Sequence, residues 1–595
     1  MRGTSSASAM GPTRTGASSP CTATCTTARM AYCDVPEIHI SEFPRGMPRT
    51  TGWIRILCLS CAYDKYRARG PALRALERHA MRPLRAADAA ATRLYGWRHN
   101  PLHQTGTVAA ALLGLLIVTG LYLLVFYRVG APWQSVQRLQ ADPWLGRWIR
   151  SLHRFASDAL VVAVVLHAWR LFAQARAWGP RALAWTSGVV LLTVLFISGW
   201  TGYVMVWDNF GAQLAVSGAR LFDAVPVLSE PVRRIFAGDQ AVPSVFFFLN
   251  LFLHVALPLA AAAGLWIHLS RLARPALLPP RPLLYAICGA LTLLAIVWPS
   301  PLAPEAALLS ISSQVPADLF YAFWLPWADA LPPWLAWTGA LVTFGIAFAM
   351  PWFTHRPRTA EWTPSVVDER SCTGCNQCPQ DCPWEAITMV PREHAHGAQS
   401  AFVARVDPAH CVSCGVCAGS CAPMGVGPAD RTGRDQLARL RAFIERSDTL
   451  ARRPVAICCE HAAPAHVAPL MEHGAEVRLV PCAGNLHTSV IELSLRAGAP
   501  GVMVYTCAPR DCRGREGPKW LHERVYNDRE AELQARVDRA RVATAVMAPG
   551  DWAGTLAAWT QFSAQLAALS ESATVPLDEQ LGAICEPVPL EEEAR

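Results

Sequence analysis

The sequence predicts three successive parts: an all-α membrane bundle, a small α+β domain and an α/β domain with a parallel sheet. Long apolar runs in the first half predict the bundle, because about 20 apolar residues can cross a bilayer as a helix. Two cysteine-rich runs follow, and short β-branched runs then alternate with helical stretches. A chain of 595 residues that is 52% apolar is long enough for all three parts.

Charge and composition narrow the class of function. The net charge is +8, but the basic residues are dispersed and almost all arginine, with Lys65 and Lys519 the only lysines. A nucleic-acid-binding protein would gather its basic residues on one face, so we expect no nucleic acid partner. Eight of the 20 cysteines fall in two tight runs, which favours a reducing compartment for that part of the chain.

Residues 1–94 show no recognisable fold, and we expect them to be disordered. Cys58 and Cys61 form a lone CxxC, which without a second pair favours incidental cysteines over half a metal site. Met81 stands just before the recognisable part and is an alternative start.

Six apolar runs predict six crossings, which place both ends of the membrane domain on one side. The runs lie near residues 105–127, 153–172, 183–206, 245–269, 282–299 and 333–353. Arginines before the first run, after the second and after the fourth favour a cytoplasmic location for both ends. Arginines also occur in the opposite loop after the first run, whereas 300–332 has no basic residue. We expect a bacterial-type cytoplasmic membrane, with the cysteine-rich parts in the cytoplasm.

Two of the apolar runs each carry two histidines fourteen residues apart, His153 with His167 and His254 with His268. Fourteen residues make almost four helical turns, so both histidines of a run face one way, roughly 21 Å apart. Two such helices side by side offer two histidine pairs, one above the other. Neutral imidazole is a suitable axial ligand for haem iron. The alternative, scattered core histidines, is disfavoured by the repeat.

Four glycines keep the same spacing, Gly106 with Gly120 in the run before and Gly188 with Gly202 in the run between. Glycine lets something flat approach a helix backbone closely. We therefore expect a di-haem four-helix bundle with two further membrane helices.

Residues 95–358 resemble the cytochrome b family of quinol-oxidising complexes. The residues that carry the resemblance are Thr119-Gly120, Arg150-x-x-His153, His167-x-x-Arg170, Gly202-Tyr203-Val204 and His254-x-x-x-Pro258. The resemblance implies two b-type haems, an outer one on His153 and His254 and an inner one on His167 and His268. It also implies that Arg150 and Arg170 pair with haem propionates. The alternative is that both are ordinary arginines at the membrane edge with no role in haem binding.

The quinol-site motifs of that family are not intact here. The corresponding places read Pro316-Ala317-Asp318-Leu319 and Val206-Trp207-Asp208-Asn209. A carboxylate in a half-apolar cleft can take a proton at neutral pH, so Asp208 and Asp318 are candidates, but solvated loop acids are the favoured alternative. We expect no bifurcating quinol site of the usual sort, and a simple quinone site near either haem stays open.

Eight cysteines in residues 365–428 follow the pattern of bacterial two-cluster ferredoxins, an α+β fold. Three cysteines of each run bind one 4Fe-4S cluster and the fourth binds the other cluster. The first cluster would use Cys372, Cys375, Cys378 and Cys421, and the second Cys411, Cys414, Cys417 and Cys382. Structural zinc is the alternative, but a zinc site does not need the crossed fourth cysteine.

After a predicted linker helix in 429–453, three predicted strands end at Cys459, Cys482 and Cys507. The ends of parallel strands meet at one edge of a sheet, where Cys512 can supply a fourth thiolate. Four thiolates suit a 2Fe-2S cluster or zinc, and spacing alone does not separate these two. Cys458 is a spare that we expect to be a buried thiol.

Residues 454–570 resemble the delta subunit of methyl-viologen-reducing hydrogenases, and 571–595 read as a solvated acidic tail. The residues that carry the resemblance are Pro481-Cys482-Ala-Gly484, Gly498-Ala-Pro-Gly501-Val502 and Cys507-x-x-x-x-Cys512. It implies a flavin-containing heterodisulfide-reductase-like partner, or a hydrogenase or dehydrogenase subunit.

The combination predicts an electron-transferring subunit of a quinone-linked oxidoreductase, with lipid and quinone as further partners and no catalytic residue of its own. No Gly-rich dinucleotide motif is present, so we expect no nicotinamide or flavin on the chain itself. A conduit without a quinone site and a membrane docking anchor are the alternatives. The direction of electron flow stays open, as does the choice between a monomer and a homodimer.

Overall fold

The structure is a computed structural model that describes residues 71–225, 231–236, 242–270, 272–308, 318–354, 363–393, 400–445, 452–462, 464–527 and 529–574. The expectations for residues 1–70 and for the tail from 575 onward lie outside these ranges, as do Pro316 and Ala317.

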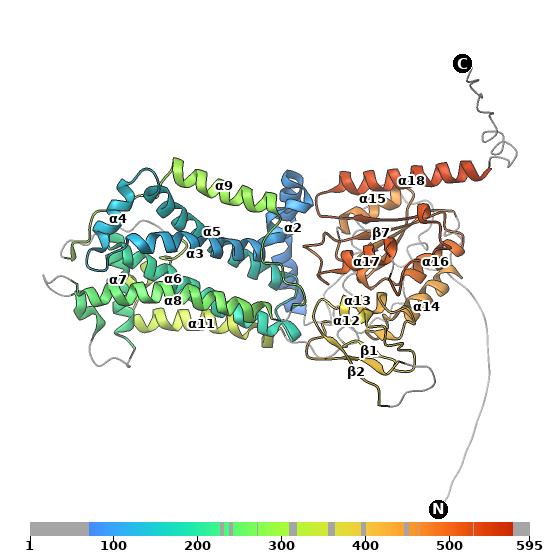
Figure 1. Ribbon diagram of the computed structural model, residues 1–595, viewed down its shortest axis with the longest axis horizontal. Helices are drawn as coiled ribbons and strands as arrows, with labels where there is room; N and C mark the ends of the chain where they lie inside the picture. The colour runs from blue at the N-terminus through green and yellow to red at the C-terminus, as the bar shows by residue number, and fades with distance from the viewer. Residues whose placement is uncertain are drawn as a thin grey trace, which may run out of the picture. The chain divides into compact units, whose positions relative to one another are not determined.

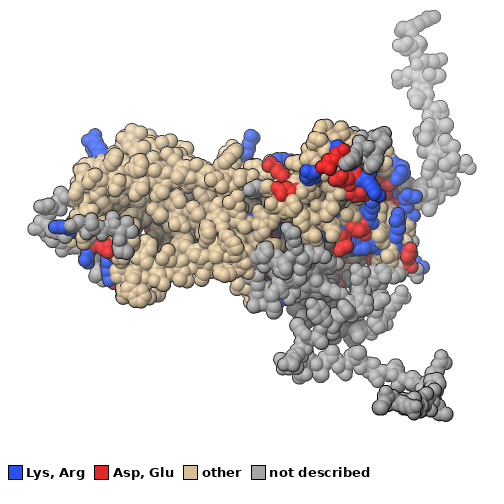
Figure 2. Space-filling view, turned by 90° about the horizontal axis from the view of Figure 1, so that it is seen from below, with Lys and Arg blue, Asp and Glu red and all other residues tan. Residues whose placement is uncertain are grey.

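Four long apolar helices form the core of the membrane domain. The helix α3 (Thr105–Phe126) packs along α5 (Gly146–Ala173), and α6 (Ala182–Val206) packs along α8 (Ser244–Leu269), as Figure 1 shows. Their outer surfaces are apolar: Val125 is 78% and Trp266 79% exposed. Figure 2 shows almost no charged residue on the visible face of the bundle between its ends. An apolar outer surface suits contact with lipid. Each helix also satisfies its own backbone hydrogen bonds, as a membrane span must.

Within the described part of the chain, five helices are long and apolar enough to cross a membrane, so this is a multi-pass membrane protein. They are Pro101–Phe126, Gly146–Ala173, Gly179–Val206, Ser244–Leu269 and Pro333–Phe353, the last being α11. The sixth expected crossing is α9 (Arg281–Val297), whose 17 residues are at the lower limit of the usual ~17–25 for a span.

The contacts at its two ends show that α9 still runs from one end of the bundle to the other. Before it, the Ala273 amide donates to the Pro383 carbonyl of the cysteine-rich domain, at 3.3 Å. After it, the Ser300 amide donates to Ser151 Oγ near the start of α5, at 2.9 Å. The cysteine-rich domains therefore contact the end of the bundle where α5 and α8 finish.

The expectation of a disordered segment up to residue 94 is wrong from Pro71 onward. A helix, α2 (Pro71–His99), lies against α5. It was missed because it buries polar groups as well as apolar ones: Asp88 is only 3% exposed. Asn100 donates to the Asp88 carbonyl and to Thr92 Oγ1, and Arg170 pairs with the Asp88 carboxylate, so these polar groups are satisfied.

The two-cluster domain is built from two short antiparallel sheets. The strand β1 (Val366–Val367) pairs with β4 (Val426–Gly427), and β2 (Ile387–Pro391) with β3 (Phe402–Val406). Each cysteine run leads into one short helix, α12 (Gln377–Asp381) or α13 (Val416–Gly419).

The C-terminal domain has a four-stranded parallel sheet in the order β6-β5-β7-β8. The first three strands are β5 (Val455–Cys459), β6 (Glu476–Val480) and β7 (Val502–Thr506). They lie where the sequence predicts strands, whereas β8 (Val542–Val546) was not expected. The sheet helices are α15 (Val467–Glu472), α16 (Thr488–Arg496), α17 (Gly517–Tyr526) and α18 (Trp552–Thr574).

The helix expected as a linker, α14 (Gly433–Ile444), is part of this C-terminal domain. Its Leu440 and Phe443 are buried in the same apolar core as the sheet. A capping box fixes its start, since Thr432 and Asp435 bind each other's backbone amides. The segment is therefore packed structure rather than a spacer.

Candidate electron-transfer centres

The four predicted histidines meet as two pairs between α5 and α8. The ring centres of His153 and His254, the outer pair, are 6.3 Å apart. Those of His167 and His268, the inner pair, are 6.5 Å apart. Two imidazole–metal bonds of about 2 Å, plus about 1 Å from nitrogen to ring centre on each side, add up to about 6 Å. Each pair therefore has the separation that one iron atom between two imidazoles requires.

Each predicted glycine lies against one of these imidazoles. A Cβ atom at Gly106 would stand 2.9 Å from His167 Cε1, and one at Gly202 would stand 2.8 Å from His254 Cε1. At Gly120 and Gly188 the distances, to His153 and His268, are 3.3 and 3.2 Å. The flat group that approaches the backbone at these points is thus the histidine ring, and the missing side chain leaves room for it.

A hydroxyl beside each glycine contacts the Nδ1 of the same histidine. The Oγ1 of Thr119 lies 2.8 Å from His153 Nδ1, and the Oγ of Ser187 lies 3.1 Å from His268 Nδ1. Thr105 and Thr201 do the same for the other two histidines, at 3.3 and 3.2 Å. The sequence analysis did not predict that these hydroxyls would contact the histidines. The signal that could have shown it is a Thr or Ser directly before each of the four glycines.

For His153, His254 and His268 these hydroxyls fix which ring nitrogen carries the proton. Thr119 Oγ1 already donates to the Leu115 carbonyl, and Ser187 Oγ donates to the Leu183 carbonyl. Each hydroxyl oxygen is left to accept from the imidazole, so Nδ1 is the protonated nitrogen. For His254 the Ser198 carbonyl, 2.9 Å from Nδ1, is a second acceptor. Nε2 is thereby left with a free lone pair, the form that binds a metal.

All four histidines and all four glycines line one cavity of about 1280 Å³. Most of its other lining is aliphatic, which suits the apolar face of a porphyrin. Cationic side chains line it where the cysteine-rich domains contact the bundle, among them Arg170, Arg176, Arg181, Arg510, Arg515 and Lys519. The buried Nε of Arg176 has no hydrogen-bond partner among the described residues. The donor set and the charge fit b-type haem and its anionic propionates.

The two arginines expected on propionates both line this cavity but already have protein partners. Arg150 donates to Gln140 Oε1 and to the Ser300 carbonyl, both at 2.8 Å. Arg170 pairs with Asp88 and Asp511. Arg176 and Arg181, which the sequence placed only as charges of a loop, reach the cavity from the segment after α5.

The two candidate quinone acids have different environments. Asp208 caps α7 (Asn209–Phe222), where its Oδ1 accepts from the Gly211 amide at 2.9 Å. Asp318 is not the solvated acid that the sequence favoured, because its side chain is only 7% exposed. It accepts from Arg154 at 2.8 Å and from the hydroxyl of Tyr203. Burial alone would raise the pKa of Asp318, but the bonds from Tyr203 and the backbone amides, with the Arg154 charge, lower it.

The eight cysteines of the two-cluster domain come together in the two crossed sets that the sequence predicts. Cys372, Cys375, Cys378 and Cys421 line one small cavity. Cys414 and Cys417 lie within electrostatic range of both Cys411 and Cys382. Burial raises the pKa of Cys417 to about 12, so this thiol is protonated at neutral pH and would release its proton on binding iron.

The four C-terminal cysteines also converge at the sheet edge. The thiol of Cys507 is within hydrogen-bond range of Cys459 and Cys512, and Cys482 interacts with Cys459 and Cys512. A Cβ at Gly517 would stand 3.3 Å from both Cys482 Sγ and Cys512 Sγ, so glycine leaves room here for a bound group. Cys458 is 0% exposed in the sheet interior, as expected for a buried thiol. These four cysteines are not close enough together to hold a single metal ion as they stand, and the same is true of every other group of three or more His, Cys, Asp or Glu among the described residues.

Comparison with known proteins finds three family models along the chain. Cytochrome b/b6/petB matches residues 98–275, the 4Fe-4S dicluster domain matches 371–425, and the methyl-viologen-reducing hydrogenase delta subunit matches 455–570. The cytochrome b subunit of menaquinol:cytochrome c reductase from Geobacillus thermodenitrificans is 28% identical over 176 residues, 28% of this chain and 79% of the relative.

A solved structure, Hyperthermophilic respiratory Complex III, shares 15% sequence identity, with a TM-score of 0.33 over 42% of this chain and 75% of that chain. The resemblances predicted from the motifs are confirmed: from N- to C-terminus, the chain combines regions matching cytochrome b, a 4Fe-4S dicluster domain and the methyl-viologen-reducing hydrogenase delta subunit.

Proposed function

We propose that this chain carries single electrons between a soluble redox complex and the membrane quinone pool. The observation that supports this most is the pair of facing histidines at 6.3 Å and the second pair at 6.5 Å on the same two helices. Haem held by these pairs would supply one-electron chemistry inside the bilayer, and iron–sulfur clusters would supply it outside.

The protein's own contribution to this function is a rigid cradle. The glycines let α3 and α6 approach the imidazoles, and the adjacent hydroxyls contact Nδ1 of each ring, which leaves Nε2 available for a metal. A ligand whose tautomer and orientation are already set needs little rearrangement when the metal binds or changes charge. His153 and His254 would hold the outer haem, and His167 and His268 the inner one.

The soluble part would pass electrons through two 4Fe-4S clusters and one 2Fe-2S cluster, on the cysteine sets named above. The likeness of residues 455–570 to a hydrogenase delta subunit supports a hydrogenase, dehydrogenase or flavin-containing heterodisulfide-reductase-like partner. Basic residues in the loops after α5 and α8 support a cytoplasmic position for these domains at a bacterial cytoplasmic membrane.

Quinone chemistry would take place at the outer pair. Asp318, Tyr203 and Arg154 line the haem cavity there, and Arg154 follows His153 directly in the chain. Asp158 also lines the cavity and pairs with Arg154. Together they offer carboxylate, hydroxyl and guanidinium groups that can hydrogen-bond a quinone head group, with Arg154 balancing the charge of the acids. The name of the Geobacillus relative, a menaquinol:cytochrome c reductase cytochrome b subunit, supports quinone chemistry in general.

The test is the cofactor content of the purified full chain together with reduction by an added quinol. We expect two b-type haems per chain, iron–sulfur resonances in the reduced protein, and haem that menaquinol reduces. Replacing His153, His167, His254 or His268 by alanine should each remove one haem, whereas the exposed His79 serves as the matched control. If no quinol reduces the haem, the chain is an electron conduit without a quinone site. If the chain contains neither haem nor iron, the electron-transfer proposal is refuted and a docking anchor is the reading that stays.

A further inference from the structure

We infer that the C-terminal iron–sulfur centre, rather than the two-cluster domain, is the direct electron partner of the inner haem, and that the Arg170–Asp511 ion pair holds the two centres together. The inference rests on the proposed function. It places the centres in an order that differs from their order along the chain.

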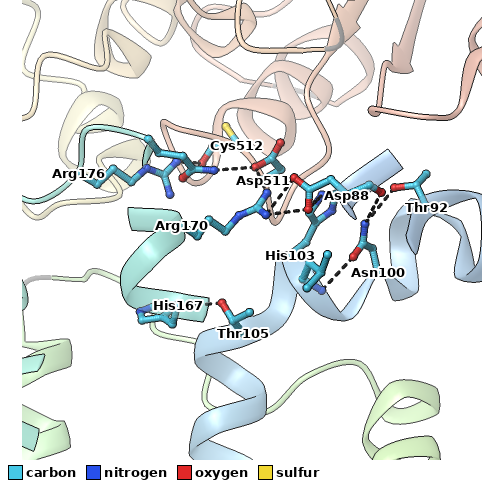
Figure 3. Close-up of polar contacts among 12 residues, drawn as sticks. Asp88, Thr92, Asn100, His103, Thr105, His167, Arg170, Arg176, Asp511 and Cys512 are labelled. Carbon is cyan, nitrogen blue, oxygen red and sulfur yellow. Dashed lines mark hydrogen bonds and ion pairs between the residues drawn. The ribbon is translucent and has the colours of Figure 1, made fainter. Parts of the chain in front are cut away.

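The ion pair joins a candidate haem ligand to a candidate cluster ligand by a short path (Figure 3). Arg170 follows His167 by three residues on α5, which is about 4.5 Å along the helix and on nearly the same face. Its Nη2 lies 2.5 Å from Asp511 Oδ1, and Asp511 directly precedes Cys512. Three helical residues, one ion pair and one peptide bond thus connect the two ligands.

The rest of the cysteine loop is held in the same way by the segment that follows α5. Gln174 donates to Asp511 Oδ1 at 2.9 Å, and Arg176 donates to the Cys512 carbonyl at 2.8 Å. Arg181 donates to the Arg513 carbonyl at 3.2 Å. Three successive residues of the loop, Asp511 to Arg513, are therefore bound by the end of α5 and the segment that follows it. Asp88 of α2 holds the other side of Arg170, at 2.8 Å.

The haem cavity itself reaches the C-terminal centre. Among the described residues, Cys512 is the only candidate cluster ligand that lines the cavity shared by His167 and His268. The two-cluster domain contributes Trp384 to the lining but none of its eight cysteines. Electron tunnelling slows steeply with distance, so the centre whose own ligand faces the cavity is favoured as the partner.

The two-cluster domain instead adjoins the C-terminal centre. A Cβ at Gly514 would stand 3.7 Å from Cys414 Cβ, 3.7 Å from Cys482 Sγ and 4.0 Å from Cys512 Sγ. One glycine thus separates a ligand of the second 4Fe-4S cluster from two ligands of the C-terminal centre. The relay that follows runs from the first 4Fe-4S cluster to the second, then to the C-terminal centre and on to the inner haem. The same relay serves either direction of flow.

The experiment measures haem reduction after photoreduction of the full-length protein by deazaflavin, with rapid-freeze resonance spectra of the clusters. In the parent, all three cluster signals appear before the haem is reduced. In Cys482→Ser, which removes the C-terminal centre, both 4Fe-4S signals should persist while haem reduction slows at least 100-fold. A Cys375→Ser/Cys482→Ser variant gives the background from direct reduction by the dye.

A second variant keeps every cluster and tests the ion pair alone. Asp511→Asn should retain all signals and both haem spectra while electron transfer to the inner haem slows at least tenfold. The control Asp538→Asn, at a helix cap elsewhere in the same domain, should keep the parental rate. Parental rates in Cys482→Ser would overturn the relay order, and parental rates in Asp511→Asn would overturn the role of the ion pair. A parent chain without haem or without a third cluster signal would instead refute the proposed function.

Discussion

Replacing Gly106 by alanine tests whether the cradle of the inner haem depends on the glycine. The added Cβ would stand 2.9 Å from His167 Cε1, whereas ordinary contact begins at 3.4 Å. The ring must therefore move by 3.4 − 2.9 = 0.5 Å away from α3. Metal–ligand distances in well-formed sites stay within about 0.2 Å of their standard values. The substitution should weaken or break the axial bond on that side of the inner haem.

The four glycines form a graded series for this argument. At Gly202 the required movement is 3.4 − 2.8 = 0.6 Å, and at Gly120 only 3.4 − 3.3 = 0.1 Å. The outer haem should therefore be lost in Gly202→Ala but kept in Gly120→Ala, since a movement of 0.1 Å lies within that range of about 0.2 Å.

A matched control is available on the same helix. Gly114 has no atom within 4 Å of its Cβ position, so Gly114→Ala gains about 1 kcal/mol of helix propensity without a clash. At Gly106 the same gain is set against an overpacking cost of about 1–3 kcal/mol, which leaves a net destabilisation of about 0 to 2 kcal/mol. The difference between the two variants isolates the contact with the ring.

The assay is haem content per chain by pyridine haemochrome, with the low-temperature resonance of low-spin ferric haem. We expect two haems in the parent, in Gly114→Ala and in Gly120→Ala. In Gly106→Ala and in Gly202→Ala we expect one haem, or one converted to high spin. If Gly106→Ala kept two low-spin haems with the parental signal, the reasoning that the glycine makes room for a haem ligand would be refuted.

Three further substitutions test other parts of the site. Thr119→Val removes the hydroxyl 2.8 Å from His153 Nδ1 and should weaken binding of the outer haem by roughly 10- to 100-fold, measured as haem loss on dilution. The control Thr107→Val, whose hydroxyl bonds to Gln104, should bind haem as tightly as the parent. Cys459→Ser should abolish the C-terminal cluster resonance, whereas its neighbour change Cys458→Ser should preserve it; loss of the signal in both would contradict the assignment of ligands. Arg524→Ala removes buried hydrogen bonds to the Gly484 carbonyl of the C-terminal domain and to Ser420 Oγ of the two-cluster domain, and it leaves the buried carbonyl without a donor. The change should cost about 1–3 kcal/mol and lower the melting temperature of both domains, and an unchanged melting curve would argue against their shared interface.

Periodicity in the sequence was enough to predict which residues meet at the candidate centres, because the candidate ligands repeat with the helix. The fourteen-residue spacing of histidines and glycines brings them to one face of each helix wherever the helix stands. The crossed cysteine runs and the strand-end cysteines are likewise local patterns whose geometry follows from a loop or from the edge of a parallel sheet. These features need only nearby residues, and nearby residues are what a single sequence displays.

Contacts between distant segments were decided only in three dimensions. The sequence could not tell that Asp511 meets Arg170, 341 residues away, or that α2 is ordered by burying Asp88 against the same arginine. Nor could it tell that Asp318 is buried beside Tyr203 rather than solvated. A charged residue looks the same in a sequence whether water or a partner surrounds it, and the partner is brought to it only by packing. The proposed order of the centres depends on such contacts, so only the tertiary structure could suggest it.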